Sequence, residues 1–481
     1  MAIALRKAGI TDFVILERDG AIGGTWRDNT YPGVACDVES HLYSYSFAPN
    51  PGWSRAYAPG PEINAYLQRV AREHGVLPHV ELSAEVASVV RDDARRLWQI
   101  TTTAGVRYTA DIVVAATGGL CNPAWPDVPG MAQFRGTSLH SAQWRADAPL
   151  DGARVAVIGT GASAIQIVPA LAPRVAQLTV YQRTPPWIIP RRDRAFGSVA
   201  RAAFAKVPGL RRAYRASLYW RHELRAIAFT RDRRLLKLGE RMARAHLARQ
   251  VADPALRATL TPSYALGCKR VLISNDYYPA LCRPNVELVP GAVRAVTATG
   301  VVGGDGALRP HDAIVYATGF AVHEYVSRIQ LVGRGGVTIA AAWQDGAAAY
   351  LGASVPAFPN LFLLVGPNTG LGHNSMLLMI EAQVAYVTGA IQFLRTGVAR
   401  TVEVRADTVA RYDAELQARL ATTVWDQGGC RSWYLDPGGR NSILWPGFVH
   451  EFVRRTRRFD PSAYVLDADA PRASAPRAAI R

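Results

Sequence analysis

The chain has 481 residues, a formal net charge of +17, 49% hydrophobic residues and 19% charged residues. This length suggests two to four domains, and the composition is typical of a soluble globular protein. We find no apolar run near the roughly 18 to 20 residues of a membrane span, no signal peptide and no nucleic-acid motif. We therefore expect a protein without a transmembrane segment or a nucleic-acid partner.

Five cysteines are scattered along the chain, at Cys36, Cys121, Cys268, Cys282 and Cys430. They form no close pair in the sequence. This spacing argues against a disulfide framework, against a cysteine zinc site and against the paired redox cysteines of disulfide reductases. We expect no metal site, and a reducing cytoplasm is the simplest location.

The chain opens with MAIALRKAGITDFVILERDGAIGGTW. A helix over Ala2–Ala8, a glycine stop at Gly9 and an apolar strand over Phe13–Leu16 lead to Glu17. This order is the second half of a dinucleotide-binding βαβ unit, in which the acid binds a ribose hydroxyl. The sequence lacks the strand and glycine-rich turn of the first half, and we attribute this to a misplaced start or a truncated record.

A complete βαβ unit begins at Arg154 with RVAVIGTGASAIQIVPALAPRVAQLTVYQR. Gly159, Gly161 and Ala164 form a GxGxxA turn between an apolar strand and a helix, which is the context that dinucleotide binding requires. The second strand ends on Arg183, which suits the 2′-phosphate of NADPH. Glu17 instead suits the free ribose of FAD.

Two further segments, DIVVAATGG at 111–119 and DAIVYATGF at 312–320, are apolar strands that end in Ala-Thr-Gly. An arginine-rich region over about 195–265 is helical in pattern. We expect a solvated insertion there, with weak contact to an anionic membrane surface as the alternative. The sequence thus predicts an α/β protein with two Rossmann-like domains. They comprise a truncated FAD-binding part at 1–121, an NADP-binding domain with the insertion at 122–340, a second FAD-binding part at 341–465 and a disordered tail at 466–481.

With these motifs in order, the sequence resembles the class B flavin monooxygenases, especially the Baeyer–Villiger type. GGTWRDNTYPGVACDVESHLYSYSF is similar to the flavin-proximal stretch of that family, and FRGTSLHSAQW matches its FxGxxxHxxxW fingerprint. VYQRTPPWIIP and GCKRVLISNDYYPAL are also similar to family segments. Arg145 departs from the Pro or Asp that usually follows the fingerprint, and the opening strand and GxGxxG are lacking.

The resemblance implies an enzyme that inserts one oxygen atom of O₂ next to a ketone carbonyl, through a flavin C4a-peroxide, to give an ester or lactone. Arg270 matches the family's catalytic arginine, whose fixed cation suits a peroxide anion. Asp37 matches the acid near that arginine and is also expected near the cofactor. His140 and Trp144 are expected to couple NADPH binding to domain position, although a purely structural histidine is an equal alternative.

The cofactor contacts follow from the resemblance and from the two βαβ units. FAD and NADP are the expected cofactors, and a small lipophilic ketone and O₂ are the expected reactants. The expected FAD-side residues are Glu17, Gly23, Gly24, Thr25, Trp26, Tyr43 and Met376. The expected NADP-side residues are Gly159, Thr160, Gly161, Ser163, Gln166, Arg183, Thr184 and Lys269.

Two alternatives stay open at this point. The first is a monooxygenase that oxidises nitrogen or sulfur, in which Arg270 is less critical. The second is a truncated chain that binds NADP but does not hold FAD, because the missing turn normally binds the FAD pyrophosphate.

Overall fold

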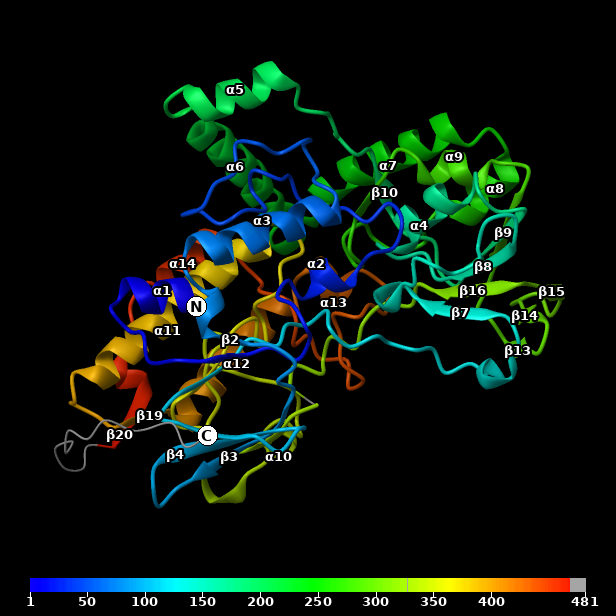
Figure 1. Ribbon diagram of the computed structural model, residues 1–481. Helices are drawn as coiled ribbons and strands as arrows, with labels where there is room; N and C mark the ends of the chain where they lie inside the picture. The colour runs from blue at the N-terminus through cyan, green and yellow to red at the C-terminus, as the bar shows by residue number, and fades with distance from the viewer. Residues whose placement is uncertain (327, 468–481) are drawn as a thin grey trace.

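The computed structural model describes residues 1–326 and 328–467 (Figure 1). The NADP-side unit is a five-stranded parallel sheet of order β12-β9-β8-β16-β7. Helix α4 (Ala164–Leu171) packs on this sheet and on α9 (Tyr277–Leu281). The second βαβ unit is therefore confirmed, with an Ala-Thr-Gly strand paired directly to the strand that precedes the glycine turn. The five strands are β7 (Thr137–His140), β8 (Arg154–Ile158), β9 (Gln177–Gln182), β12 (Val286–Pro290) and β16 (Ala313–Tyr316).

On the FAD side, α1 (Ala2–Lys7) leads to β1 (Ile15–Leu16), which pairs in parallel with β2 (Val80–Glu81). β6 (Val113–Ala115) pairs in parallel with β18 (Leu361–Leu363) and thereby joins two segments almost 250 residues apart. The expectation of a strand and a GxGxxG turn before α1 stays a prediction. A second sheet has the order β17-β3-β4-β5, with β3 (Val86–Asp92), β4 (Leu97–Thr102), β5 (Arg107–Ala110) and β17 (Gln330–Val332).

The arginine-rich region folds as helices, as the sequence predicts. α5 (Ser198–Lys206) and α6 (Leu210–Thr230) extend above α3 (Gly60–Glu73), whereas α7 (Leu236–Gln250) and α8 (Pro254–Leu260) lie beside the NADP-side sheet (Figure 1). α7 packs on β10 (Ile188–Ile189), which pairs with β11 (Leu272–Ile273). The insertion therefore contacts both nucleotide-binding halves.

Helix α11 (Met376–Arg395) is long and apolar enough to cross a membrane by length and composition, although Glu381 and Gln383 interrupt its apolar sequence. It packs on α1 and α14 (Val449–Thr456). Its side chains Met379, Val387 and Ala390 are fully buried in the protein core, so we interpret it as a core helix.

The C-terminal boundary needs one correction. β19 (Thr401–Val404) pairs with β20 (Tyr464–Asp467), so Leu466 and Asp467 belong to a strand and not to the predicted tail. Residues 468–481 lie outside the described residues. The remaining elements are α2 (Thr25–Asp28), α10 (Ile339–Ala342), α12 (Ala406–Leu420), α13 (Val424–Gln427), β13 (Ala295–Thr297), β14 (Gly300–Val302) and β15 (Leu308–Pro310).

Candidate active site

The glycine turn after β8 has the close packing that a dinucleotide turn needs. Gly159 has φ +111°, and a Cβ built there would lie 2.5 Å from the carbonyl oxygen of Ala317, in the Ala-Thr-Gly segment that follows β16. Only glycine fits this position. The Thr160 hydroxyl donates a 3.1 Å hydrogen bond to the carbonyl of Thr184, which fixes the turn against the end of β9. Gly161 faces open space, and Ser163 is the N-cap residue of α4.

Two cations predicted to bind the NADP 2′-phosphate, Lys269 and Arg183, are near enough for their charges to interact. Lys269 places its Nζ 5.1 Å from the centroid of the Tyr264 ring. Burial and the nearby charge of Arg183 lower the pKa of Lys269. Two like charges near each other suit a dianion, since a phosphate would relieve their repulsion and accept hydrogen bonds from both. Their role as the 2′-phosphate site stays a prediction.

The predicted catalytic pair is also formed. Arg270 lies just before β11, and its guanidinium donates two hydrogen bonds to Asp37, from Nε to Oδ2 at 2.7 Å and from Nη2 to Oδ1 at 2.8 Å. The negative charge of Asp37 raises the pKa of Arg270 against the opposing effect of burial. The Arg270 side chain keeps 32% of its exposure, so a fixed, permanently charged group remains accessible.

Several of the expected FAD-side residues lie in or beside the loop that leads into α2. Gly23 and Gly24 have φ values of +132° and +50°, and a Cβ built on Gly23 would lie 2.5 Å from the buried Oδ1 of Asn64. That oxygen is among the buried polar atoms without a hydrogen-bond partner in the described part of the chain. The Trp26 indole donates to the Tyr43 hydroxyl at 3.1 Å, which holds both rings in place.

Three more of the predicted FAD contacts have defined positions. Thr25 is the first residue of α2, and Met376 is the first residue of α11. Glu17 follows β1, but its carboxylate accepts a hydrogen bond from the backbone N–H of Asp19 and lies 3.5 Å from Nη1 of Arg27. A ribose hydroxyl would therefore share this acceptor with Arg27.

Gln166 makes contacts that the sequence did not indicate. Its Oε1 accepts from the Tyr31 hydroxyl at 3.1 Å, and its Nε2 donates to the carbonyl of Ala35 at 3.0 Å. The side chain thus joins α4 of the NADP-side unit to the loop that carries Asp37. Its role in NADP binding stays a prediction, because these protein groups already occupy the amide.

His140 and Trp144 both lie in the connection into the NADP-side sheet. His140 is almost fully buried; its Nδ1 accepts from the backbone N–H of Ala142, and its Nε2 lies 3.4 Å from the hydroxyl of Thr318. Trp144 packs against the core of the NADP-side unit. These contacts hold the fingerprint against the Ala-Thr-Gly segment, and the coupling role stays a prediction.

A buried polar network near Asp37 escaped the sequence analysis. The carboxylate of Glu39 lies 2.5 Å from His222 Nε2 and 2.5 Å from Arg221 Nη2, both on α6. Burial alone would raise the pKa of Glu39, but His222 and Arg221 lower it to about 2. The network fixes the Asp37 loop to the helical insertion. Glu39 and His222 are 183 residues apart, so no local sequence motif indicates their contact.

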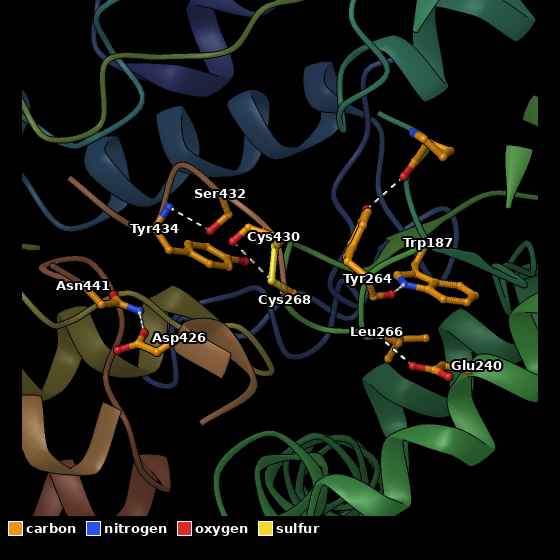
Figure 2. The surroundings of a disulfide bond; sticks show 11 residues. Trp187, Glu240, Tyr264, Leu266, Cys268, Asp426, Cys430, Ser432, Tyr434 and Asn441 are labelled. Carbon is orange, nitrogen blue, oxygen red and sulfur yellow. Dashed lines mark hydrogen bonds between the residues drawn. A yellow bond between two sulfur atoms is a disulfide. The ribbon is translucent and has the colours of Figure 1, made fainter. Parts of the chain in front are cut away.

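One sequence-based prediction is wrong. Cys268 and Cys430 form a disulfide across a separation of 162 residues (Figure 2). Cys36, Cys121 and Cys282 are free. Sequence spacing reveals only pairs that are close along the chain, and this pair forms because the fold brings α13 and its following loop onto the segment before Arg270. The disulfide also removes one of the arguments for a reducing compartment.

Comparison with known proteins finds relatives that span nearly the whole chain. A family model described as pyridine nucleotide-disulphide oxidoreductase matches residues 1–197. A Baeyer–Villiger monooxygenase of Pseudomonas aeruginosa is 47% identical over 97% of this chain and 89% of its own, and one of Streptomyces coelicolor is 46% identical over 98% and 91%. The crystal structure of cyclohexanone monooxygenase from Rhodococcus sp. Phi1 bound to NADP⁺ superposes with a TM-score of 0.86 at 29% identity, covering 97% of both chains.

The two nucleotide-binding units and these relatives define a flavin-dependent monooxygenase, with FAD and NADP as its cofactors. The chain belongs to the Baeyer–Villiger monooxygenase family. The family model matches only the part with the free cysteines Cys36 and Cys121, so that likeness concerns nucleotide binding and not a redox disulfide.

Proposed function

We propose that this enzyme uses NADPH and O₂ to convert a small lipophilic ketone into the corresponding ester or lactone. The observation that carries the proposal is the Arg270–Asp37 pair, in which two short hydrogen bonds fix a guanidinium that stays partly exposed. When bound, FAD would supply the reaction with O₂, and NADPH would supply the electrons for it. A preoriented cation stabilises the negative charge that develops when oxygen is transferred to a carbonyl carbon.

The other residues of the site bind and orient the cofactors. Arg183 and Lys269 hold the 2′-phosphate, which selects NADPH over NADH. Gly159 and Gly161 allow the backbone of the turn to approach the pyrophosphate. On the FAD side, Glu17 holds the ribose, and the segment from Gly23 to Trp26, with Tyr43, Met376 and Asp37, contacts the rest of the cofactor.

Oxidation of nitrogen or sulfur is the alternative within the same class of enzyme. Such substrates are nucleophiles, so the reaction does not need an anionic oxidant and depends less on Arg270. The test is product analysis of the purified enzyme with NADPH, O₂ and matched panels of ketones, amines and sulfides. Ester or lactone formation supports the proposal, whereas oxidation of sulfides and amines alone would replace it.

Retention of FAD is tested on the same preparation. We expect the chain to keep FAD through gel filtration, with the absorption bands of bound flavin, because Gly23–Trp26, Tyr43 and Met376 contribute contacts beyond the pyrophosphate. A colourless protein that binds NADP would instead support a chain that does not hold FAD on its own.

The location and a surface contact complete the proposal. We place the enzyme in the cytoplasm, with weak contact to an anionic membrane surface through the start of α7. Leu235, Leu238 and Met242 are 50%, 71% and 40% exposed to solvent. Their spacing places them on one side of a helix. Six arginine and lysine residues and two acids lie between residues 231 and 244. Exposed apolar groups among cations suit the headgroup region of such a membrane.

A further inference from the structure

The disulfide lies next to the proposed catalytic arginine. We propose that Cys268 and Cys430 are positioning residues whose disulfide holds the segment of Lys269 and Arg270 against the loop after α13, and that a dithiol reductant releases this constraint. The inference rests on the proposed role of Arg270, but its first test, the oxidation state of the two cysteines, does not.

The two segments joined by the disulfide are tightly packed on each other. The backbone N–H of Ala265 donates a 2.9 Å hydrogen bond to the carbonyl of Gly428. A Cβ built on Gly428 would lie 2.5 Å from the Cβ of Cys268. Gly267 has φ +96°, and a Cβ built there would lie 2.4 Å from the Phe229 ring. Gly267 and Gly428 therefore let the two backbone segments approach closely enough for the disulfide to form.

Both ends of the disulfide lead to groups at the site. Arg270 follows Cys268 by two residues. Tyr434, which lies near the disulfide in Figure 2, follows Cys430 by four residues. Tyr434 is almost fully buried; burial raises its pKa to about 12, and the positive charge of Arg270 acts against that shift. The charge of Arg270 thus acts on Tyr434, and the disulfide joins the two segments that carry these residues.

Without the disulfide, Arg270 keeps its hydrogen bonds to Asp37 and the pairing of β11 with β10. It loses the covalent constraint on the residues that precede it. A guanidinium that samples more orientations stabilises a developing charge less well, while its mere presence is unchanged. Reduction should consequently uncouple the reaction, so that NADPH is oxidised without ester formation, and should not abolish NADPH oxidation.

The disulfide is open to reduction from one side. Cys268 is fully buried, whereas Cys430 is partly exposed. A thiolate of the dithiol attacks the Cys430 sulfur and forms a mixed disulfide, and Cys268 leaves as a thiolate that takes up a proton. The second thiol of the reductant then displaces Cys430. Two electrons and two protons pass to the protein, and the dithiol becomes a disulfide.

The first experiment counts thiols in the denatured holoenzyme by alkylation and mass measurement. We expect three alkylated cysteines without reductant (Cys36, Cys121 and Cys282) and five after dithiothreitol. Five alkylated cysteines without reductant, in protein kept under air and purified without thiols, would overturn the proposal.

The second experiment measures ester formed per NADPH oxidised, with and without dithiothreitol. The variants are Cys430→Ser and, as matched control, Cys282→Ser at an exposed free cysteine. We expect reduction to lower this ratio at least about threefold in the wild type and in Cys282→Ser. Cys430→Ser should give the low ratio under both conditions, with FAD content unchanged.

An unchanged ratio in reduced wild-type enzyme would overturn the positioning role even if the disulfide is present. Failure of the proposed function has a different signature, namely ester formation that persists in Arg270→Ala. If Cys430→Ser does not fold, the reduced wild-type enzyme alone decides the question.

Discussion

Asp37 and Arg270 are 233 residues apart in the chain, yet their side chains form two parallel hydrogen bonds of 2.7 and 2.8 Å. The pair joins the loop on the FAD side to the segment that also carries Lys269. One carboxylate therefore fixes the direction of the cation at the centre of the proposed chemistry.

Replacing Asp37 with asparagine should lower ester formation by roughly 10- to 100-fold, because the guanidinium loses its charged, bidentate partner. NADPH oxidation should fall much less. The measurement is the ratio of ester formed to NADPH consumed. The control is Asp92→Asn, which changes a carboxylate at the end of β3 and outside the candidate site. Equal loss of both activities in Asp37→Asn would indicate a structural role only.

Replacing Lys269 with alanine should raise the Kd of NADP⁺ about tenfold, which corresponds to about 1.4 kcal/mol, and should leave the weaker Kd of NAD⁺ nearly unchanged. Arg183→Ala should act in the same direction, because we propose that both cations bind the same phosphate. Titration of bound cofactor by fluorescence checks this, with Lys237→Ala as the exposed lysine control. An equal effect on NAD⁺ and NADP⁺ would contradict the assignment.

The Glu39 network predicts how stability depends on pH. Contacts with His222 and Arg221 lower the pKa of Glu39 from its ordinary value of 4.5 to about 2, so the carboxylate stabilises the folded state above pH 4.5. That contribution, of order 3 kcal/mol, is lost as the pH falls from about 4.5 toward 2. The urea midpoint of unfolding should therefore fall less between pH 6 and pH 3 in Glu39→Gln than in the wild type.

The control for this experiment is Glu73→Gln, at an exposed carboxylate on α3. It should keep the full pH dependence of the wild-type midpoint. The account of the network is wrong if Glu39→Gln shows the same fall in midpoint between the two pH values as the wild type.

The membrane contact predicts selective binding to anionic vesicles. The protein should co-sediment with vesicles that contain phosphatidylglycerol and not with phosphatidylcholine alone. Changing Leu235 and Leu238 to serine should weaken this binding about tenfold by removing exposed apolar area. Val398→Ser, at a 58% exposed valine after α11, is the control. Equal binding of all three proteins would show that the leucines make no contact.

The sequence predicted the parts of this protein that are local along the chain. The strand, glycine turn, helix and strand of β8, α4 and β9 follow from a continuous pattern, and Arg183 has a fixed place at the end of that unit. Arg270, Lys269 and Asp37 were found through the family resemblance, and the structure brings Arg270 to Asp37.

The features that sequence analysis missed are contacts between distant segments. Cys268 meets Cys430, and Glu39 meets His222, only after the insertion and the C-terminal helices have packed. No periodicity or spacing encodes such pairs. Gln166 shows the same limitation, because its place near the start of α4 suggested a cofactor contact, whereas tertiary packing directs its amide to Tyr31 and Ala35.

The measurement that tests the central claim most directly is ester formation by Arg270→Ala, compared with the wild type on the same ketone and with FAD content matched. The account predicts that NADPH oxidation remains measurable while ester formation falls at least about 100-fold, since the fixed cation is lost. Arg270→Lys should recover only part of the activity, because lysine lacks the bidentate contact. Ester formation by Arg270→Ala at near the wild-type rate would contradict the account.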